Sequence, residues 1–332
     1  MLSRVADHIY WMNRYIERAE NYARFMDVNF NLSLDLQPDE AAQWRPLVVT
    51  TGDWPLYQSL HKTVSKSKVI HFLGFDERNP NSVHNCIVYA RENARSIRPE
   101  ITKEVWEQIN YLYYFVKEGT SKKKWENKDP RNYFLEIKKG CQMLYGILNS
   151  TISRSEGWHF GRIGQLIERA DKTSRVLDVK YHILLPESVK VGSPFDLIQW
   201  SALLKSVSAY DMYRRKYGKL TAQGICEFLI FDKHFPRSIL SCLTDVDRSL
   251  RSNSNKDSIY RSTAEKQLGL LRSQLEYSDI NEVFETGVHE FLDNIQVRLN
   301  EVSESIFQNY FSVADHYKSE NPLFSNNNKQ VQ

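Results

Sequence analysis

A short run of residues occurs twice in this chain of 332 residues. The sequence IERAE at residues 16–20 returns 151 residues later as IERAD at residues 167–171. Between residues 16–28 and 167–179, seven of thirteen aligned positions are identical, whereas ordinary residue usage would give roughly one. The sequence therefore predicts that the chain was built by a tandem duplication.

Composition and periodicity favour helices. The chain has only 13 glycines and 10 prolines, and a strand-rich fold would need more turn residues. From Ser3, a favoured N-cap residue, apolar side chains recur at three- and four-residue steps to about residue 36, as in an amphipathic helix. Similar patterns predict helical segments at residues 102–116, 134–152, 263–276 and 280–311.

Duplication and helical periodicity together define the expected architecture. We predict an all-α protein in which two pseudo-symmetric tandem helical repeats pack into one bundle-like body. The first repeat covers residues 1–152 and the second covers 153–312. The polar residues that follow, 313–332, are expected to form a flexible tail.

The predicted opening helix carries charged residues beside its apolar stripe. At 100° per residue, Glu17, Glu20, Arg24 and Asp27 fall within one arc that borders this stripe. Glu20 and Arg24 are spaced i,i+4, and Arg24 and Asp27 are spaced i,i+3, so each pair can interact. Arg18 points about 100° away from Glu17, which predicts that it contacts a different helix.

A second repeated pattern has the chemistry of a helix start. Residues 75–82 return at 231–238, where the offset has grown to 156, so the second copy should contain an enlarged loop between 179 and 200. A proline in a first helical turn lacks an N–H that would be unpaired there, and oxygen side chains accept the free N–H groups. The residues assigned to these two starts are Asp76, Ser82, Asp232 and Ser238.

The segment after the first of these starts, residues 90–98, is dense in basic and amide side chains. It includes Arg91, Asn93 and Arg95, of which only Arg95 has an identical counterpart, Arg251, in the second copy. If the chain has one functional site, the first half carries the more polar version of this helix.

Charge and hydropathy exclude several classes of partner. Lys and Arg outnumber Asp and Glu by 44 to 41, and a net charge of +3 gives no strong field for nucleic acid or an anionic membrane. The N-terminus lacks the apolar core of a signal peptide, and no run of about 18 apolar residues is present. We therefore expect a cytoplasmic protein that binds neither nucleic acid nor membrane.

Motifs for known chemistry are missing from the sequence. The four cysteines contain no C-x-x-C pair and are expected to be buried thiols. Neither a G-x-S-x-G elbow nor a glycine-rich phosphate loop is present. No cofactor is therefore expected, and the lysine run 122–124 is interpreted as solvated surface. The residues leave open whether the chain is an enzyme, and they do not define its oligomeric state.

The repeated Glu-Arg pair resembles the signature of the alpha-E family, bacterial all-helical proteins named for an ER motif. The resemblance also covers the opening residues 1–11, the helix start at 75–82 and the segment 90–98. It implies association with ATP-grasp carboxylate-amine ligases and transglutaminase-like proteins in a peptide synthesis or modification system. It implies no catalytic residue.

Three hypotheses follow for the charged residues. In the first, the chain is a non-catalytic scaffold whose Glu-Arg pairs are buried bridges between the repeats. In the second, arginines at the interface between the repeats hold a carboxylate or phosphate of a ligand. In the third, Glu17, Glu20, Glu168 and Asp171 bind a catalytic metal, although the spacing of a di-metal bundle is not repeated and no metal is expected.

His8 and His159 occupy equivalent positions and are interpreted as hydrogen-bonded structural residues rather than as acids or bases. They complete the set of candidate binding residues, which is Glu17, Arg18, Glu168, Arg169, Arg91, Asn93, Arg95, His8 and His159.

Overall fold

The structure, a computed structural model, describes residues 1–35, 40–121, 130–182, 193–254 and 262–312. Every regular element in these ranges is a helix, and they contain no strand, which confirms the all-α prediction. The predicted enlarged loop lies largely outside the described residues, as do the lysine run at 122–124 and the tail at 313–332. None of the helices in the described ranges has the length and apolar character needed to span a membrane.

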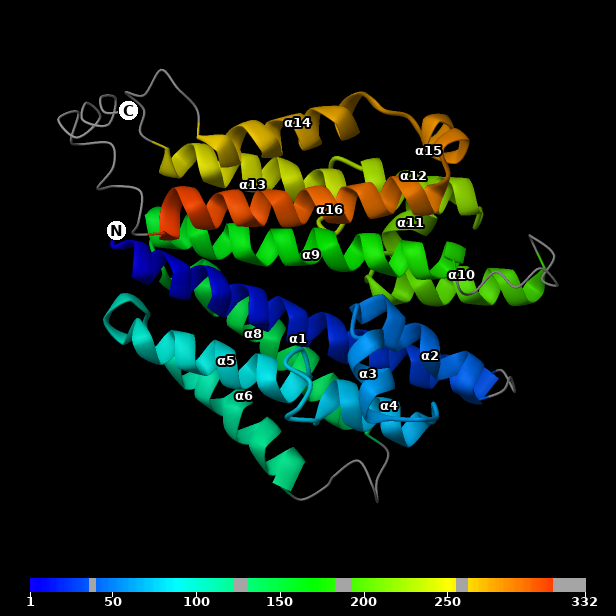
Figure 1. Cartoon of the computed structure of the whole chain (residues 1–332), viewed down its shortest axis with the longest axis horizontal. Coiled ribbons are helices and arrows are strands. Elements are labelled where there is room, and N and C mark those ends of the chain that lie inside the picture. The colour runs from blue at the N-terminus through cyan, green and yellow to red at the C-terminus, as the bar shows by residue number, and fades with distance from the viewer. Residues whose placement is uncertain (36–39, 122–129, 183–192, 255–261, 313–332) are drawn as a thin grey trace, which may run out of the picture.

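Two long helices form the centre of the molecule. Helix α1 (Ser3–Asp35) and helix α9 (Glu156–His182) lie side by side and run in the same direction (Figure 1). Their backbones approach closely at Gly164, where an added Cβ would lie 2.4 Å from the Tyr10 carbonyl oxygen. No other residue type fits there without a shift of the two helices.

The other helices cover the two sides of this central pair (Figure 1). On the α1 side lie α2 (Glu40–Thr51), α3 (Trp54–Leu60), α4 (Lys66–Gly74), α5 (Val83–Ser96), η1 (Arg98–Glu100), α6 (Lys103–Ser121) and α8 (Arg131–Thr151). After α9 come α10 (Pro194–Ser206), α11 (Tyr210–Tyr217), α12 (Ala222–Phe231), α13 (Ile239–Asn253), α14 (Thr263–Tyr277), α15 (Ile280–Thr286), α16 (Val288–Ile306) and η2 (Phe307–Phe311).

The closing segment differs from its expected form. The sequence pattern at 280–311 has helical periodicity throughout, yet α15 ends before Gly287 and α16 begins after it. Gly287 has a φ of 99°, a conformation that a side chain would disfavour and that interrupts a helix. Periodicity alone does not reveal this break, because the apolar positions on both sides of Gly287 face the same core.

Helices α5 and α13 begin at the predicted serines, but Pro80 and Pro236 precede these N-caps and so lie outside the first helical turns, where proline was expected. Ser82 caps α5 by accepting the Asn85 N–H, and Ser238 caps α13 by accepting the Ser241 N–H. The two aspartates accept N–H groups within the preceding turns: Asp76 from Arg78 at 3.0 Å, and Asp232 from His234 at 2.8 Å and Phe235 at 2.6 Å.

One hydrophobic cluster extends through both halves of the chain. It includes Ile16 of α1 and the equivalent Ile167 of α9, which are both 1% exposed. The four cysteines are buried thiols, as expected. Burial raises the pKa of the Cys86 thiol to about 12 and that of Cys242 to about 11, so neither is a thiolate at neutral pH.

Candidate functional site: the crossed Glu-Arg network

The two repeated Glu-Arg pairs bind each other across the α1–α9 contact. Arg169 donates from Nε to Glu17 Oε1 at 2.9 Å and from Nη2 to Glu17 Oε2 at 2.8 Å. Arg18 donates from Nε to Glu168 Oε1 at 2.7 Å and from Nη2 to Glu168 Oε2 at 2.9 Å. Each arginine therefore makes a bidentate ion pair with the glutamate of the other helix, and Arg18 does contact a different helix, as predicted.

Helix geometry explains this crossing. Adjacent residues on a helix point about 100° apart. The Glu and Arg side chains of one helix therefore do not pair with each other. Two parallel helices that present the same pair at the same level can satisfy both charges reciprocally. The repeated sequence thus encodes a reciprocal contact, with Glu17 against Arg169 and Arg18 against Glu168.

The network is almost completely removed from solvent. Both glutamates are 0% exposed, and the side chains of Arg18 and Arg169 are 14% and 9% exposed. Taking such charges out of water costs several kcal/mol per ion unless each finds partners of opposite charge and further hydrogen bonds. The residues around the two glutamates supply these additional partners.

Glu17 is surrounded by donors from three elements. Arg237, in the turn before α13, donates to Glu17 Oε1 at 3.2 Å and to Glu20 Oε2 at 2.5 Å. Gln165 of α9 donates to Glu17 Oε2 at 3.3 Å, and Asn21 of α1 donates to Glu17 Oε1 at 3.1 Å. Burial alone would raise the pKa of Glu17, but Arg169 and Arg237 outweigh it and hold that pKa well below its usual range.

Glu168 has a comparable set of cations. Arg14 donates to Glu168 Oε2 from Nε at 3.0 Å, and Lys172 Nζ lies 3.5 Å from Glu168 Oε1. Against the effect of burial, Arg18, Lys172 and Arg14 lower the pKa of Glu168 well below its ordinary value. Arg18 also donates to Asn81 at 2.6 Å, and so connects this glutamate to the turn before α5.

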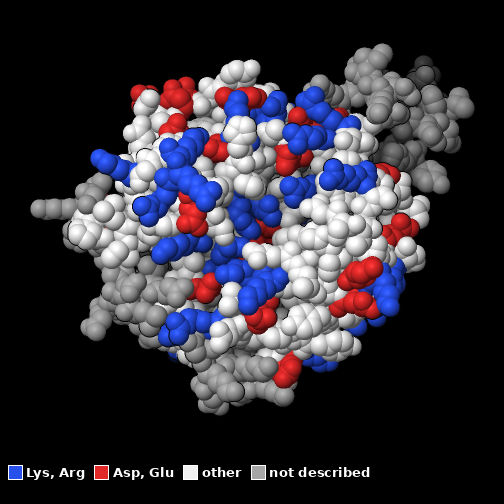
Figure 2. Space-filling view, turned by 180° about the vertical axis from the view of Figure 1, so that it is seen from behind, with Lys and Arg blue, Asp and Glu red and all other residues white. Residues whose placement is uncertain are grey.

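Seven basic side chains face four carboxylates in this network. The carboxylates are Glu17, Glu20, Glu168 and Asp171, and the basic residues are Arg14, Arg18, Arg24, Arg169, Lys172, Arg175 and Arg237. Glu20 pairs with Arg24, as its spacing predicted, whereas Asp27 pairs with Lys138 of α8 at 2.8 Å. On the face shown in Figure 2, Lys and Arg gather across the middle with Asp and Glu interspersed.

This arrangement limits the chemistry of the glutamates. A carboxylate whose pKa is depressed holds its proton too weakly to act as a general acid near neutral pH. The oxygens of Glu17 and Glu168 also already accept several hydrogen bonds from arginine and amide groups. The geometry therefore favours a structural connection between the helices over a reactive centre.

The remaining candidate residues lie apart from this network. Arg91 donates to Asn110 Oδ1 at 2.8 Å and lies 4.4 Å from the centre of the Tyr113 ring. Arg95 is 67% exposed and pairs with Glu92 at 2.5 Å. The structure thus brings Arg18 and Arg169 to one place but directs Arg91 and Arg95 toward partners on α5 and α6.

The two equivalent histidines have different surroundings. His8 Nδ1 lies 2.8 Å from Asn93 Oδ1, which is the hydrogen bond expected of a structural histidine. The His159 ring packs edge-on against Trp158, and its buried Nδ1 has no hydrogen-bond partner among the described residues. Burial and then Arg154 lower the pKa of His159, so the ring is neutral at pH 7.

Sequence analysis missed three members of the network. Arg14 and Lys172 lie one turn from the Glu-Arg pairs on their own helices, at i−4 from Arg18 and i+4 from Glu168, and this spacing could have indicated them. Arg237 offered no such signal, because it follows Pro236 in a helix start more than 200 residues from Glu17.

The fold and this network define a class of all-helical proteins in which paired Glu-Arg motifs meet between two central helices. The chain belongs to the Alpha-E family, whose model is described as a predicted alpha-helical domain with a conserved ER motif and matches residues 1–311.

Two curated relatives are uncharacterised proteins of Mycobacterium bovis and Mycobacterium tuberculosis. Each is 21% identical over 337 aligned residues, which cover 94% of this chain and 36% of the relative. The chain therefore spans little more than a third of the length of these relatives. No solved structure matches the chain.

Proposed function

We propose that this protein is a non-catalytic helical scaffold in which the crossed Glu-Arg pairs lock two tandem repeats together. The observation that carries the proposal is the complete burial of Glu17 and Glu168 in bidentate pairs with arginines of the opposite helix. Removing one partner of such a pair leaves an uncompensated buried charge. The network thus selects one arrangement of the two central helices.

The proposed duplication is supported by equivalent contacts in the two halves. Arg14 donates to Glu168, and its equivalent, Gln165, donates to Glu17. Glu20 pairs with Arg24 one turn on, and the equivalent Asp171 pairs with Arg175. These parallels favour two pseudo-symmetric repeats, at residues 1–152 and 153–312, that pack as one body.

We further propose that the scaffold is an accessory component of a cytoplasmic peptide synthesis or modification system. Its proposed partners are an ATP-grasp-type ligase and a transglutaminase-like protein, as the family resemblance implies. The length of the curated relatives supports an accessory role, because they carry this unit within chains more than twice as long.

The partner proposal is tested by affinity purification of the tagged chain from its native host. Mass spectrometry of the bound proteins should identify a ligase of the ATP-grasp type, and this ligase should be absent from a purification of an unrelated tagged helical protein. Recovery of the folded chain with neither proposed partner, under conditions that preserve weak complexes, would contradict the accessory role.

The metal-dependent alternative is less favoured by the geometry. Glu17, Glu20, Glu168 and Asp171 each pair with arginine or lysine side chains. Within the described ranges, no three His, Cys, Asp or Glu side chains are grouped as a metal site would need. A cation at these carboxylates would have to displace several charge-assisted hydrogen bonds.

A further inference from the structure

Two turns of the structure are equivalent, and each of them contacts an arginine of a central helix. One turn joins α2 to α3 at Gly52, and the other joins α10 to α11 at Ser208, at the same offset of 156 residues as the two helix starts. Gly52 and Ser208 both have a positive φ, of 82° and 52°. In both turns the N–H of this residue donates to the carbonyl three residues earlier, at 2.9 Å and 3.1 Å.

The arginine at each turn comes from the opposite half of the chain. Arg24 of α1 donates to the Ser208 hydroxyl. Its equivalent, Arg175 of α9, lies against Gly52, where an added Cβ would be 3.1 Å from Arg175 Nη1. The side chain of Arg24 is 5% exposed, and that of Arg175 is 25% exposed. Serine thus supplies an oxygen and cover to Arg24, whereas glycine supplies neither to Arg175.

Arg175 therefore has unused donors. Its Nε donates to both oxygens of Asp171 at 3.0 Å, but its two Nη groups have no acceptor within the described part of the chain. Asp53, the acid beside the turn, has other partners, because Asn81 donates to one of its oxygens at 2.7 Å and Tyr22 to the other at 3.0 Å. The fork formed by two Nη groups matches two oxygens of a carboxylate or a phosphate.

Positive charge is in excess around this guanidinium. Lys172 Nζ lies 2.9 Å from Asp171 Oδ2, so two cations share that carboxylate. Glu168 of the same helix already binds Arg14 and Arg18. Four basic side chains thus face two carboxylates in this part of the network. An anion would offset the excess at a side chain that is three-quarters buried, where charges interact more strongly than on an exposed surface.

We propose that the site formed by Arg175 and Gly52 binds an oxyanion, a carboxylate or a phosphate group, at the two Nη groups beside the α2–α3 turn. The oxyanion has the role that the Ser208 hydroxyl has at Arg24, and it adds the negative charge that a hydroxyl lacks. Asp171 already orients the guanidinium through Nε, which lowers the cost of ordering this side chain when the anion binds.

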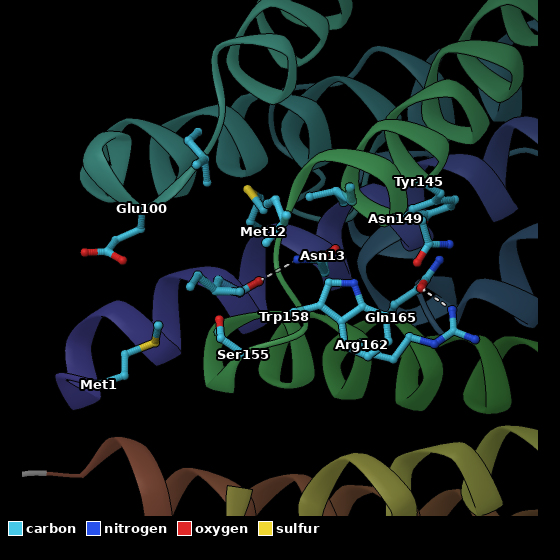
Figure 3. A pocket seen from close by; sticks show the side chains of 16 residues that line it. Met1, Met12, Asn13, Glu100, Tyr145, Asn149, Ser155, Trp158, Arg162 and Gln165 are labelled. Carbon is cyan, nitrogen blue, oxygen red and sulfur yellow. Dashed lines mark hydrogen bonds between the residues drawn. The ribbon is translucent and has the colours of Figure 1, made fainter. Parts of the chain in front are cut away.

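An arginine beside a cavity is not sufficient for such a site. A cavity of about 90 Å³ lies between α1, α8 and α9, and Arg162 is among its lining residues (Figure 3). Arg162 donates from Nη1 to Gln165 at 2.8 Å and from Nη2 to Asp245 at 3.4 Å. Both of its Nη groups therefore have acceptors, whereas those of Arg175 have none among the described residues.

NMR titration of the isotopically labelled full chain tests the proposal, with sodium phosphate and sodium acetate as probes at constant ionic strength. At least one anion should bind saturably with a Kd of about 1 mM, because the site offers two charge-assisted hydrogen bonds. Binding should shift the Arg175 Nε–H signal and the amide signals of Gly52 and Asp53. Tighter binding of acetate identifies a carboxylate as the ligand group, and tighter binding of phosphate identifies a phosphoryl group.

Two variants assign the site. Arg175→Gln should weaken binding about tenfold or more, as followed at the Asp53 amide, and Gly52→Ser should weaken it similarly because its hydroxyl occupies the Nη groups. The matched control is Ser208→Gly, at the equivalent turn, which should leave the shift at Asp53 unchanged. Melting curves confirm that the variants are folded. Absence of a saturable shift with either anion at about 100 mM, or unchanged binding to Arg175→Gln or Gly52→Ser, would overturn the proposal.

Discussion

At the scale of the residue, Glu17 shows how a buried charge specifies a contact. Its two oxygens accept from Arg169, and Arg237, Asn21 and Gln165 donate to the remaining positions. The Tyr145 hydroxyl makes no hydrogen bond of ordinary geometry among the described residues, but after Arg169 and Arg237 it also helps to lower the pKa of Glu17. An apolar side chain would fill the same space but would not distinguish one register of α1 on α9 from another.

The crossed pair should therefore be energetically coupled. We expect Glu17→Ala and Arg169→Ala each to lower the free energy of unfolding by about 3 to 5 kcal/mol, because each leaves its former partner buried and unpaired. The double variant should lose much less than the sum of the single losses, since it leaves no unpaired member of the couple. Urea unfolding of the four proteins measures this coupling.

An exposed ion pair provides the control for that experiment. Lys103 and Glu107 are spaced i,i+4 on α6, with side chains 78% and 60% exposed. Replacing either with alanine should cost at most about 1 kcal/mol, because water solvates the remaining charge. Similar losses for the exposed and buried pairs would contradict the assignment of the Glu-Arg network as an interhelical lock.

The depressed pKa values predict sensitivity to acid. The pKa of Glu17 and Glu168 lies below the ordinary value of 4.5 in the folded protein, so the unfolded chain binds more protons as the pH falls. The stability they contribute is present above about pH 4.5 and is lost as the pH drops through and below that value.

Urea unfolding between pH 7 and pH 3 measures this dependence. Glu168→Gln should be less stable than the wild type at pH 7, because Arg18 and Arg14 lose their counter-charge. It should also show a shallower decline in acid, so that the two proteins converge. Parallel curves for the wild type and the variant would show that Glu168 has the same pKa in the folded and unfolded states, which would contradict this prediction.

At the scale of the element, the α1–α9 contact depends on the absence of a Cβ atom at Gly164. An alanine Cβ at Gly164 would lie 2.4 Å from a backbone oxygen of α1, which cannot rotate away. At Gly146 of α8, an added Cβ would meet nothing within 4 Å. Alanine substitutions at these two glycines therefore measure helix packing at Gly164 and helix propensity at Gly146.

We expect the same substitution to have opposite effects at these positions. Gly164→Ala should destabilise the protein by about 1 to 3 kcal/mol, because the helices must separate. Gly146→Ala should stabilise it by about 0.5 to 1 kcal/mol, because alanine favours the helix and meets no obstacle. Thermal melts of both variants measure the difference, and stabilisation by both would refute the close contact.

The sequence predicted much of this element structure because helices follow local rules. Periodicity indicated the long helices, and the serine caps marked the starts of α5 and α13. These local patterns failed at two places. Gly287 breaks the closing segment through its own φ, and Arg237 reaches Glu17 only after α13 has packed on α9.

The candidate site was also predicted only in part, because local patterns identify residues but not their distant partners. Repetition of the Glu-Arg pair singled out the four residues that do meet, but not which of them bind each other. The polar segment that contains Arg91 and Arg95 was grouped with them because its residue types suit a ligand. Its register directs those two side chains toward Asn110 and Glu92 instead.

At the scale of the whole molecule, the central helices join the two halves into one core. The hydrophobic cluster contains residues of both halves, and each half contributes a glutamate that is neutralised by the other. A separated half would expose the apolar face of its central helix. It would also leave its glutamate without the arginine that compensates its burial.

We therefore expect residues 1–152, expressed alone, to show no cooperative thermal transition by circular dichroism. Co-expression with residues 153–332 should restore a folded complex that purifies through a tag on either piece, because the α1–α9 contact and the crossed pairs can form between separate chains. Arg169→Ala in the second piece should weaken this complex, since Glu17 would be buried without its bidentate partner. An isolated first half that melts cooperatively as a monomer would show that the two proposed repeats fold independently and that the network merely joins finished domains.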